Sequence, residues 1–181
     1  MERVRTMETI TKARERGILV LRLLVGWVFL FAGAEKLMQL EGHGPFSAGG
    51  FLKFATAGTW PGAAEDAIVN PTQALWVSLA ANPTALTVID FVVPVGQVLI
   101  GAALILGLAT RFAGLMGALM MGFFFVAAWD FGHGIVNQHF VYATLALFLA
   151  YARAGEIYGL DAYIERLPMV QRAPALRYVL G

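Results

Sequence analysis

A short polar segment over residues 128–140, AWDFGHGIVNQHF, carries the residue types in this chain that are best suited to chemistry. It holds Asp130, His133, Asn137, Gln138 and His139, and an apolar stretch lies on either side of it. A histidine beside carboxylates can exchange protons near neutral pH. We therefore interpret the segment as one wall of a polar pocket, with a solvated turn as the alternative interpretation.

Further ionisable residues fall at the same end of the apolar stretches. Glu35 and Lys36 close the first stretch, and Asp90 lies near the start of the second. Ionisable side chains within a membrane span are functional candidates by default, although Glu35 and Asp90 could also simply pair with Lys36. The predicted catalytic residues are His139, His133, Glu35 and Asp90.

Aromatic and amide side chains around these groups predict a site for a quinone, which needs apolar walls and hydrogen bonds to its carbonyls. His139 or His133 would donate a hydrogen bond, and a neighbouring acid would supply a proton. The residues predicted to bind this cofactor are Trp129, Tyr142, Gln97 and Asp130. Phe131 and Phe140 are further candidates for the walls.

A metal site is the weaker interpretation of the same residues. Three histidines with acids would suit zinc or copper, but HxxxH and HxxE spacings are absent from the sequence. His133 and His139 lie on either side of a turn, which fits two facing haem ligands poorly. We expect no metal or haem.

The elements that must position these residues are membrane helices. The chain is 59% hydrophobic and 14% charged, against about a quarter charged in a soluble domain. It has no cysteine, which excludes disulfides and thiol chemistry. The apolar stretches predict an all-α, four-helix transmembrane bundle with spans at about 18–37, 85–108, 112–131 and 135–154, each of about 20 residues or more.

Lysine and arginine predict how this single membrane domain, residues 1–181, is oriented. They concentrate in a polar arm over residues 1–17, at Arg111 and in a tail over residues 155–181. By the positive-inside rule both termini are cytoplasmic. Residues 38–84 then form an extracytoplasmic cap, with short amphipathic helices on the outer surface.

Individual residues within these elements carry three structural predictions. Arg22 lies about one turn inside the first span, and its long side chain can extend back to the cytoplasmic surface. Asn70 is expected to cap a short helix in the cap. Pro94, Gln97 and Gly101 follow Asp90 on one face of the second span, and we expect this face to point into the bundle because polar groups avoid lipid.

The chain resembles the DoxX/DoxD family of small four-span prokaryotic membrane proteins. The resemblance rests on RLLVGWVFLFAGAEKL, FLKFATAG, GQVLIGAALILGLATRFAGLMGALMM and NQHFVYATLALFLAYARAGEIYGLD. It is closest to the DoxD branch, the small membrane subunit of thiosulfate:quinone oxidoreductase. The resemblance implies a subunit in the cytoplasmic (inner) membrane that passes electrons from thiosulfate to quinone.

The same resemblance implies partners and a substrate site. The expected partners are a DoxA-like subunit, a quinone and the lipid bilayer, with a possible homo-oligomer and no nucleic acid. Lys36 and Lys53 become candidates to attract the thiosulfate dianion. Two other functions stay open at this point: a non-catalytic scaffold for partner redox proteins, and a transporter or binder of small ligands.

Overall fold

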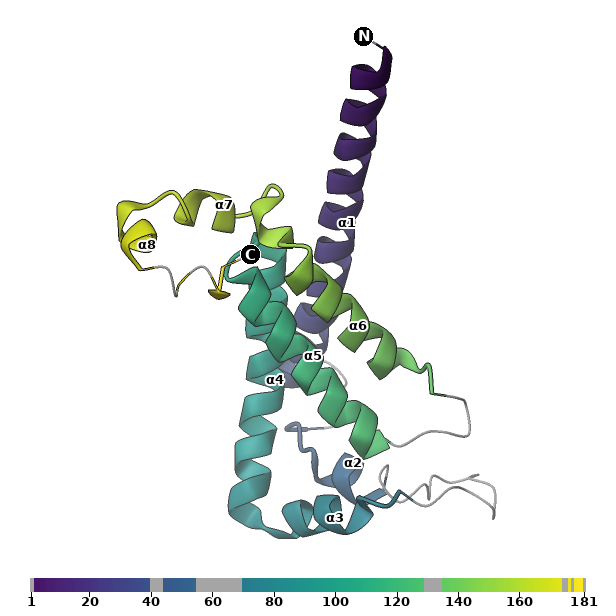
Figure 1. The fold of residues 1–181 in the computed structure, drawn as a ribbon. Helices are drawn as coiled ribbons and strands as arrows, with labels where there is room; N and C mark the ends of the chain where they lie inside the picture. Colours follow the sequence, from purple (N-terminus) through teal and green to yellow (C-terminus); the bar gives the residue numbers. More distant parts are fainter. Residues whose placement is uncertain are drawn as a thin grey trace.

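The structure is a computed structural model, and it is helical without strands over the residues that it describes. These are residues 2–39, 44–54, 70–128, 135–173, 176 and 178–180. The four longest helices are α1 (Glu2–Met38), α4 (Pro83–Leu106), α5 (Thr110–Ala128) and α6 (Gln138–Tyr151). The shorter helices are α2 (Gly49–Phe54), α3 (Gln73–Ala81), η3 (Ala154–Glu156), α7 (Asp161–Ile164) and α8 (Pro168–Arg172). Figure 1 shows the arrangement.

Within the described part of the chain, 3 helical segments are long and apolar enough to cross a membrane: Met7–Met38, Pro83–Leu106 and Thr110–Ala128.

The fourth predicted span, 135–154, contains α6, which has only 14 residues. At 1.5 Å per residue α6 is about 21 Å long, against a hydrocarbon core of about 30 Å. It begins after Asn137, whose side chain accepts a hydrogen bond from the Phe140 amide at 3.0 Å. It ends before Arg153, whose φ is 50°.

Two pairs of helices pack closely, α1 against α4 and α5 against α6. Glycines make both contacts possible. A Cβ atom on Gly101 would lie 2.3 Å from the backbone nitrogen of Leu30 in α1. A Cβ atom on Gly114 would lie 2.6 Å from the carbonyl oxygen of Ala146 in α6. Small residues let helix backbones approach in this way where hydrophobic burial between helices contributes little.

The face of α4 that carries Pro94, Gln97 and Gly101 is buried, as the sequence predicts. Its neighbour there is α1. A Cβ atom on Gly33 would lie 2.6 Å from the carbonyl oxygen of Pro94 and 2.9 Å from the Cβ atom of Gln97. These residues therefore belong to the seam between α1 and α4.

Arg22 joins the helices at one end of the molecule. Its side chain is only 1% exposed, so the prediction that it extends to the membrane surface is wrong. Its Nη1 atom donates hydrogen bonds to the carbonyl oxygens of Ala154 and Ile157, the latter at 2.9 Å. These carbonyl groups follow the last turn of α6, and they stabilise the guanidinium group inside the protein.

Asp161 completes the same end, and it is 0% exposed. Its carboxylate accepts hydrogen bonds from the backbone nitrogens of Ala109 at 2.7 Å and Thr110 at 2.9 Å. It therefore caps the first turn of α5, where amide groups lack partners within the helix. We call this end, formed by Arg22, residues 107–110 and residues 154–161, the clamp end.

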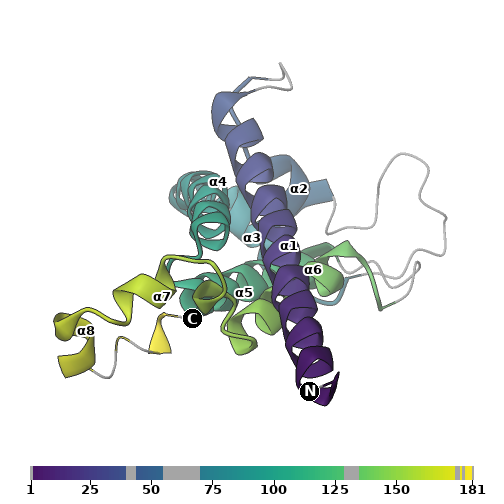
Figure 2. The same cartoon turned by 90° about the horizontal axis from the view of Figure 1, so that it is seen from above.

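The opposite end of α4 and α5 is covered by α2 and α3. Figure 1 shows α4 and α5 separating as they leave their turn, with α2 and α3 across the open end. Seen from above in Figure 2, α2 and α3 lie beneath the long helices. Leu52 and Trp76 pack there with Ala127 of α5. We call this the cap end.

Candidate functional site

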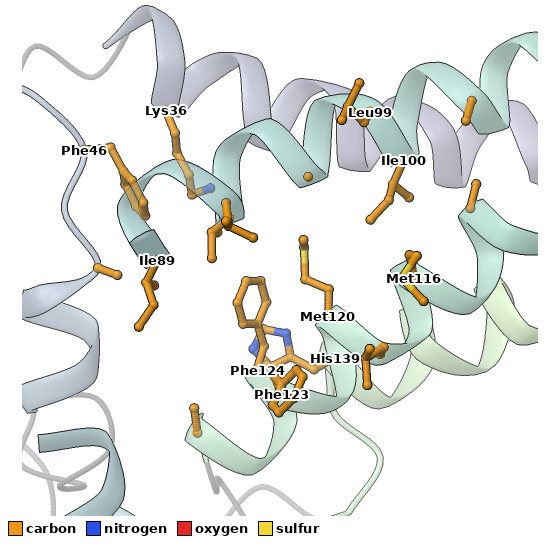
Figure 3. Close-up of a pocket in the computed structure, with 18 of the residues that line it drawn as sticks. Lys36, Phe46, Ile89, Leu99, Ile100, Met116, Met120, Phe123, Phe124 and His139 are labelled. Carbon is orange, nitrogen blue, oxygen red and sulfur yellow. The ribbon is translucent and has the colours of Figure 1, made fainter. Parts of the chain in front are cut away.

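A cavity of about 1150 Å³ lies between α4 and α5 (Figure 3). It exists because α4 and α5 are each held by another helix and separate from one another toward the cap end. Its walls run from Ile89 to Leu106 on α4 and from Phe112 to Ala127 on α5. A typical small-molecule pocket measures about 300–1,000 Å³, so this cavity is slightly larger than a typical pocket.

Two polar side chains, Lys36 of α1 and His139 of α6, reach this cavity from outside the α4–α5 pair. In Figure 3 both lie toward the cap end, whereas Leu99 and Met116 line the part nearer the clamp end. The Nζ atom of Lys36 donates a hydrogen bond to the carbonyl oxygen of Ala32 at 2.9 Å. It also lies 5.7 Å from the centre of the Phe46 ring.

His139 is held by an aromatic contact. Its ring meets the ring of Phe124 edge to face, with 5.8 Å between the ring centres. Its backbone belongs to the first turn of α6, which Asn137 caps. The Asn137 cap and the Phe124 ring thus position an imidazole that can exchange hydrogen bonds with a bound ligand.

The cavity is open along its side. Several of the apolar residues that line it also face the surroundings: Leu99 is 64% exposed, Phe123 56% and Phe112 49%. On helices that cross a bilayer, such residues contact lipid chains. A ligand dissolved in the bilayer would therefore meet this opening directly.

Two side chains fasten the cap over the cavity. The Oδ1 atom of Asp90 accepts a hydrogen bond from the backbone nitrogen of Ala48 at 2.6 Å, at the start of α2. The side-chain nitrogen of Asn70 donates to the carbonyl oxygens of Val126 at 3.2 Å and Ala127 at 3.0 Å. Asn70 was predicted to cap a helix, but α3 starts after Thr72. The Asn70 Oδ1 atom accepts a hydrogen bond from the backbone nitrogen of Thr72 at 2.8 Å, directly before α3, while its side-chain nitrogen joins the cap to the end of α5.

The structure gathers only some of the predicted site residues around the cavity. Lys36 and His139 line it, but Glu35 and Asp90 are not among its lining residues. Glu35 is half-buried on α1, and Lys53 is exposed at the end of α2. Among the residues that the structure describes, the cavity is therefore lined by apolar side chains together with Lys36 and His139.

The remaining predicted site residues lie elsewhere. Gln97 is 4% exposed and belongs to the α1–α4 seam. Tyr142 packs beside the buried core that contains Phe29 and Leu149. Trp129, Asp130 and His133 lie outside the described residues, as does Phe131. Phe140 stacks at a tilt on Phe125, with 6.1 Å between ring centres.

Sequence reasoning missed the long apolar walls of the cavity. On α5 they include Phe112, Met116, Leu119, Met120 and Phe123, which recur at the three- and four-residue spacing of one helix face. This periodic face was visible in the sequence. In a membrane span, however, an apolar face usually contacts lipid or another helix, so the pattern alone does not indicate a cavity.

The described residues offer no group of three histidine, aspartate or glutamate side chains that could hold a metal ion.

Comparison with known protein families matches residues 17–133 to the family described as DoxX. The matched region contains α1 from residue 17 onward, the cap, α4 and α5, and therefore most of the cavity walls. Comparisons with curated proteins and with solved structures found no match. Because the family match covers more than half of the chain, and because its apolar helices can cross a bilayer, this chain belongs to the DoxX family of membrane proteins.

Proposed function

We propose that this DoxX family protein binds a membrane quinone in the cavity between α4 and α5 and passes to it electrons taken from thiosulfate. The observation that carries the proposal is the shape and polarity of the cavity. It is apolar along α4 and α5, and Lys36 and His139 reach it toward the cap end. A quinone has the same distribution, with a polar ring and a long apolar tail.

The two side chains suit the chemistry of the ring. A quinone takes up two electrons and two protons as it becomes a quinol. His139 can donate a hydrogen bond to one carbonyl oxygen and pass on a proton, and the Lys36 ammonium group can stabilise negative charge on the reduced ring. Inside an apolar cavity both interactions are stronger than in water.

Thiosulfate is proposed as the electron source on the basis of the family resemblance. Two thiosulfate ions each lose one electron and join through a sulfur–sulfur bond as tetrathionate, which supplies the two electrons for the quinone. A DoxA-like partner would hold the thiosulfate pair beside the cap. Lys53, exposed on α2, and Lys36 would attract the dianions to that side.

We also propose the arrangement of the protein in a prokaryotic cytoplasmic membrane. The residues before and after α6 complete a fourth span beside α5, so that both termini lie in the cytoplasm. The clamp end then faces the cytoplasm, and the cap faces outward, where thiosulfate is available. The excess of lysine and arginine in the arm and the tail supports this orientation.

The test is quinone binding by the gently purified full-length protein, measured by mass spectrometry of retained lipids and by titration with added quinone. We expect His139→Ala to bind quinone at least ten-fold more weakly, because a buried hydrogen bond and a ring contact are lost, together about 1.4 kcal/mol or more. Gln138→Ala is the matched control, because Gln138 is the exposed neighbour on the same helix turn. Equal binding by His139→Ala and wild type would exclude this site.

A non-catalytic scaffold is the second candidate function, favoured by the exposed rim at Leu99, Phe112 and Phe123. A membrane helix of a partner protein could fill the groove instead of a quinone. In that case the purified chain retains no quinone, and a partner helix cross-links to the rim in the native membrane.

A further inference from the structure

The cavity is long as well as large. Its walls on α4 extend from Ile89 to Leu106, which is about 25 Å of helix at 1.5 Å per residue and most of the depth of a hydrocarbon core of about 30 Å. Polar groups reach it only toward the cap end, among the residues described. This distribution matches a molecule with one polar head and one long apolar tail that points toward the clamp end.

Two of the residues that line the cavity from opposite helices are in contact with each other. A Cβ atom on Gly96 of α4 would lie 2.9 Å from the terminal methyl carbon of Met120 of α5, and both residues line the cavity. Met120 therefore reaches across to α4 at a position without a side chain. The methionine side chain is unbranched and flexible, so Met120 can move aside for a ligand more easily than a branched side chain.

Figure 3 shows Met120 between two groups of lining residues. Lys36, Phe124 and His139 lie on one side of Met120, and Leu99, Ile100 and Met116 lie on the other. For a molecule whose head contacts Lys36 and His139, the route to the apolar part that stays inside the cavity runs between Gly96 and Met120.

We propose that Gly96 and Met120 form a passage for the apolar tail of the quinone, and that this passage makes the site specific for long-tailed molecules. The inference rests on the proposed function, because it takes the quinone ring as the head. Met120 fills the space beside Gly96 and moves aside to admit the tail, and glycine leaves room for the tail because it has no side chain. The tail gains contacts along α4 and α5 that a tail-free ring cannot make.

The variant that tests the passage is Gly96→Leu. The atom nearest to the new Cβ atom is the flexible end of Met120, so the helices need not separate, but the leucine side chain fills the passage. The control is Gly122→Leu on α5, where a Cβ atom meets nothing within 4 Å and which does not line the cavity. Both variants replace a helical glycine with the same residue.

Each full-length variant, reconstituted in lipid nanodiscs, is titrated with two probes: a ubiquinone with its full isoprenoid tail, and the same ring without a tail. We expect wild type and Gly122→Leu to bind the tailed probe at least ten-fold more tightly than the tail-free ring. Gly96→Leu should lose that preference while its affinity for the tail-free ring stays unchanged.

The two proposals fail in different ways. If Gly96→Leu keeps the full preference for the tailed quinone, or if wild type shows no preference, the passage is wrong even where quinone binding stands. If wild type binds neither probe, the proposed function fails and the passage with it. If Gly96→Leu does not fold, Ala103→Leu replaces it, because the new side chain fills the part of the cavity nearer the clamp end. Loss of the preference for the tailed quinone is again expected, and an unchanged preference would again contradict the passage.

Discussion

At the scale of single residues, the charged groups that the structure buries most deeply stabilise the fold at the end away from the cavity's polar groups. Arg22 is 1% exposed and Asp161 is 0% exposed. Arg22 donates to backbone carbonyls after α6, and Asp161 accepts from backbone amides before α5. Each charge satisfies backbone groups that helix ends leave without partners. Burial of a charge is therefore insufficient to identify a catalytic residue in this protein.

Replacing Arg22 should strongly destabilise the protein. In Arg22→Met the carbonyl oxygens of Ala154 and Ile157 lose their donor, and Asp161 loses a nearby positive charge. Breaking a buried charged network of this kind costs about 3–5 kcal/mol. The measurement is the free energy of unfolding in mixed detergent micelles. Arg172→Met is the control, because Arg172 is exposed on α8 and its loss should change stability by less than about 0.5 kcal/mol.

At the scale of helices, glycine decides which neighbours touch. The glycines of α1 and α4 face one another, so that the two backbones are in contact and no space for a ligand remains between them. Between α4 and α5 larger side chains line the facing surfaces, and the helices separate to leave a cavity. The small residues thus explain the close contact of α1 with α4, while the cavity lies between the two helices that lack such a contact along their length.

The α1–α4 contact should be sensitive to a single methyl group. In Gly101→Ala the new Cβ atom would lie 2.3 Å from the Leu30 nitrogen and 2.7 Å from the Gly26 oxygen, so α1 and α4 must move apart. Overpacking of this kind costs about 1–3 kcal/mol, again measured by unfolding in detergent. Gly122→Ala, with open space around it, should be neutral or stabilising by about 0.5–1 kcal/mol. Equal stability of the two variants would contradict the close contact.

At the scale of the whole molecule, the clamp end is fastened by hydrogen bonds and the cap end is the wider one. The hydrogen bonds of Arg22 and Asp161 join α1, α5 and the segment after α6 at the clamp end. The cap is attached by Asp90 and Asn70 across the wider end. A ligand seated in the cavity would therefore present its polar head beneath the cap, on the side proposed to face outward.

That orientation can be tested with single cysteines, because the natural chain has none. Gly50 on α2 and Met169 on α8 are both exposed in the structure. We expect a membrane-impermeant maleimide to label Gly50→Cys in intact spheroplasts. Met169→Cys should be labelled only after the membrane is permeabilised, because the proposed topology places the tail in the cytoplasm. The reverse pattern would overturn the proposed topology.

The sequence by itself determined that this is a helical membrane protein, because apolar stretches of sufficient length have few other stable structures. Its motifs also indicated the DoxX family. The boundaries of α4 and α5 lie within a few residues of the prediction. The buried face at Pro94, Gln97 and Gly101 followed from the cost of placing polar groups in lipid.

Only the tertiary structure decided which polar residues meet. The sequence places Glu35, Asp90 and His139 at the same depth in the predicted membrane spans. That depth does not determine which way each side chain points once the helices pack together. Asp90 turns to the cap and Gln97 turns to α1, and of the predicted polar residues that the structure describes, His139 and Lys36 line the cavity. The cavity itself depends on how far apart α4 and α5 are held, and that separation is set by contacts with α1, α6 and the cap that no local pattern records.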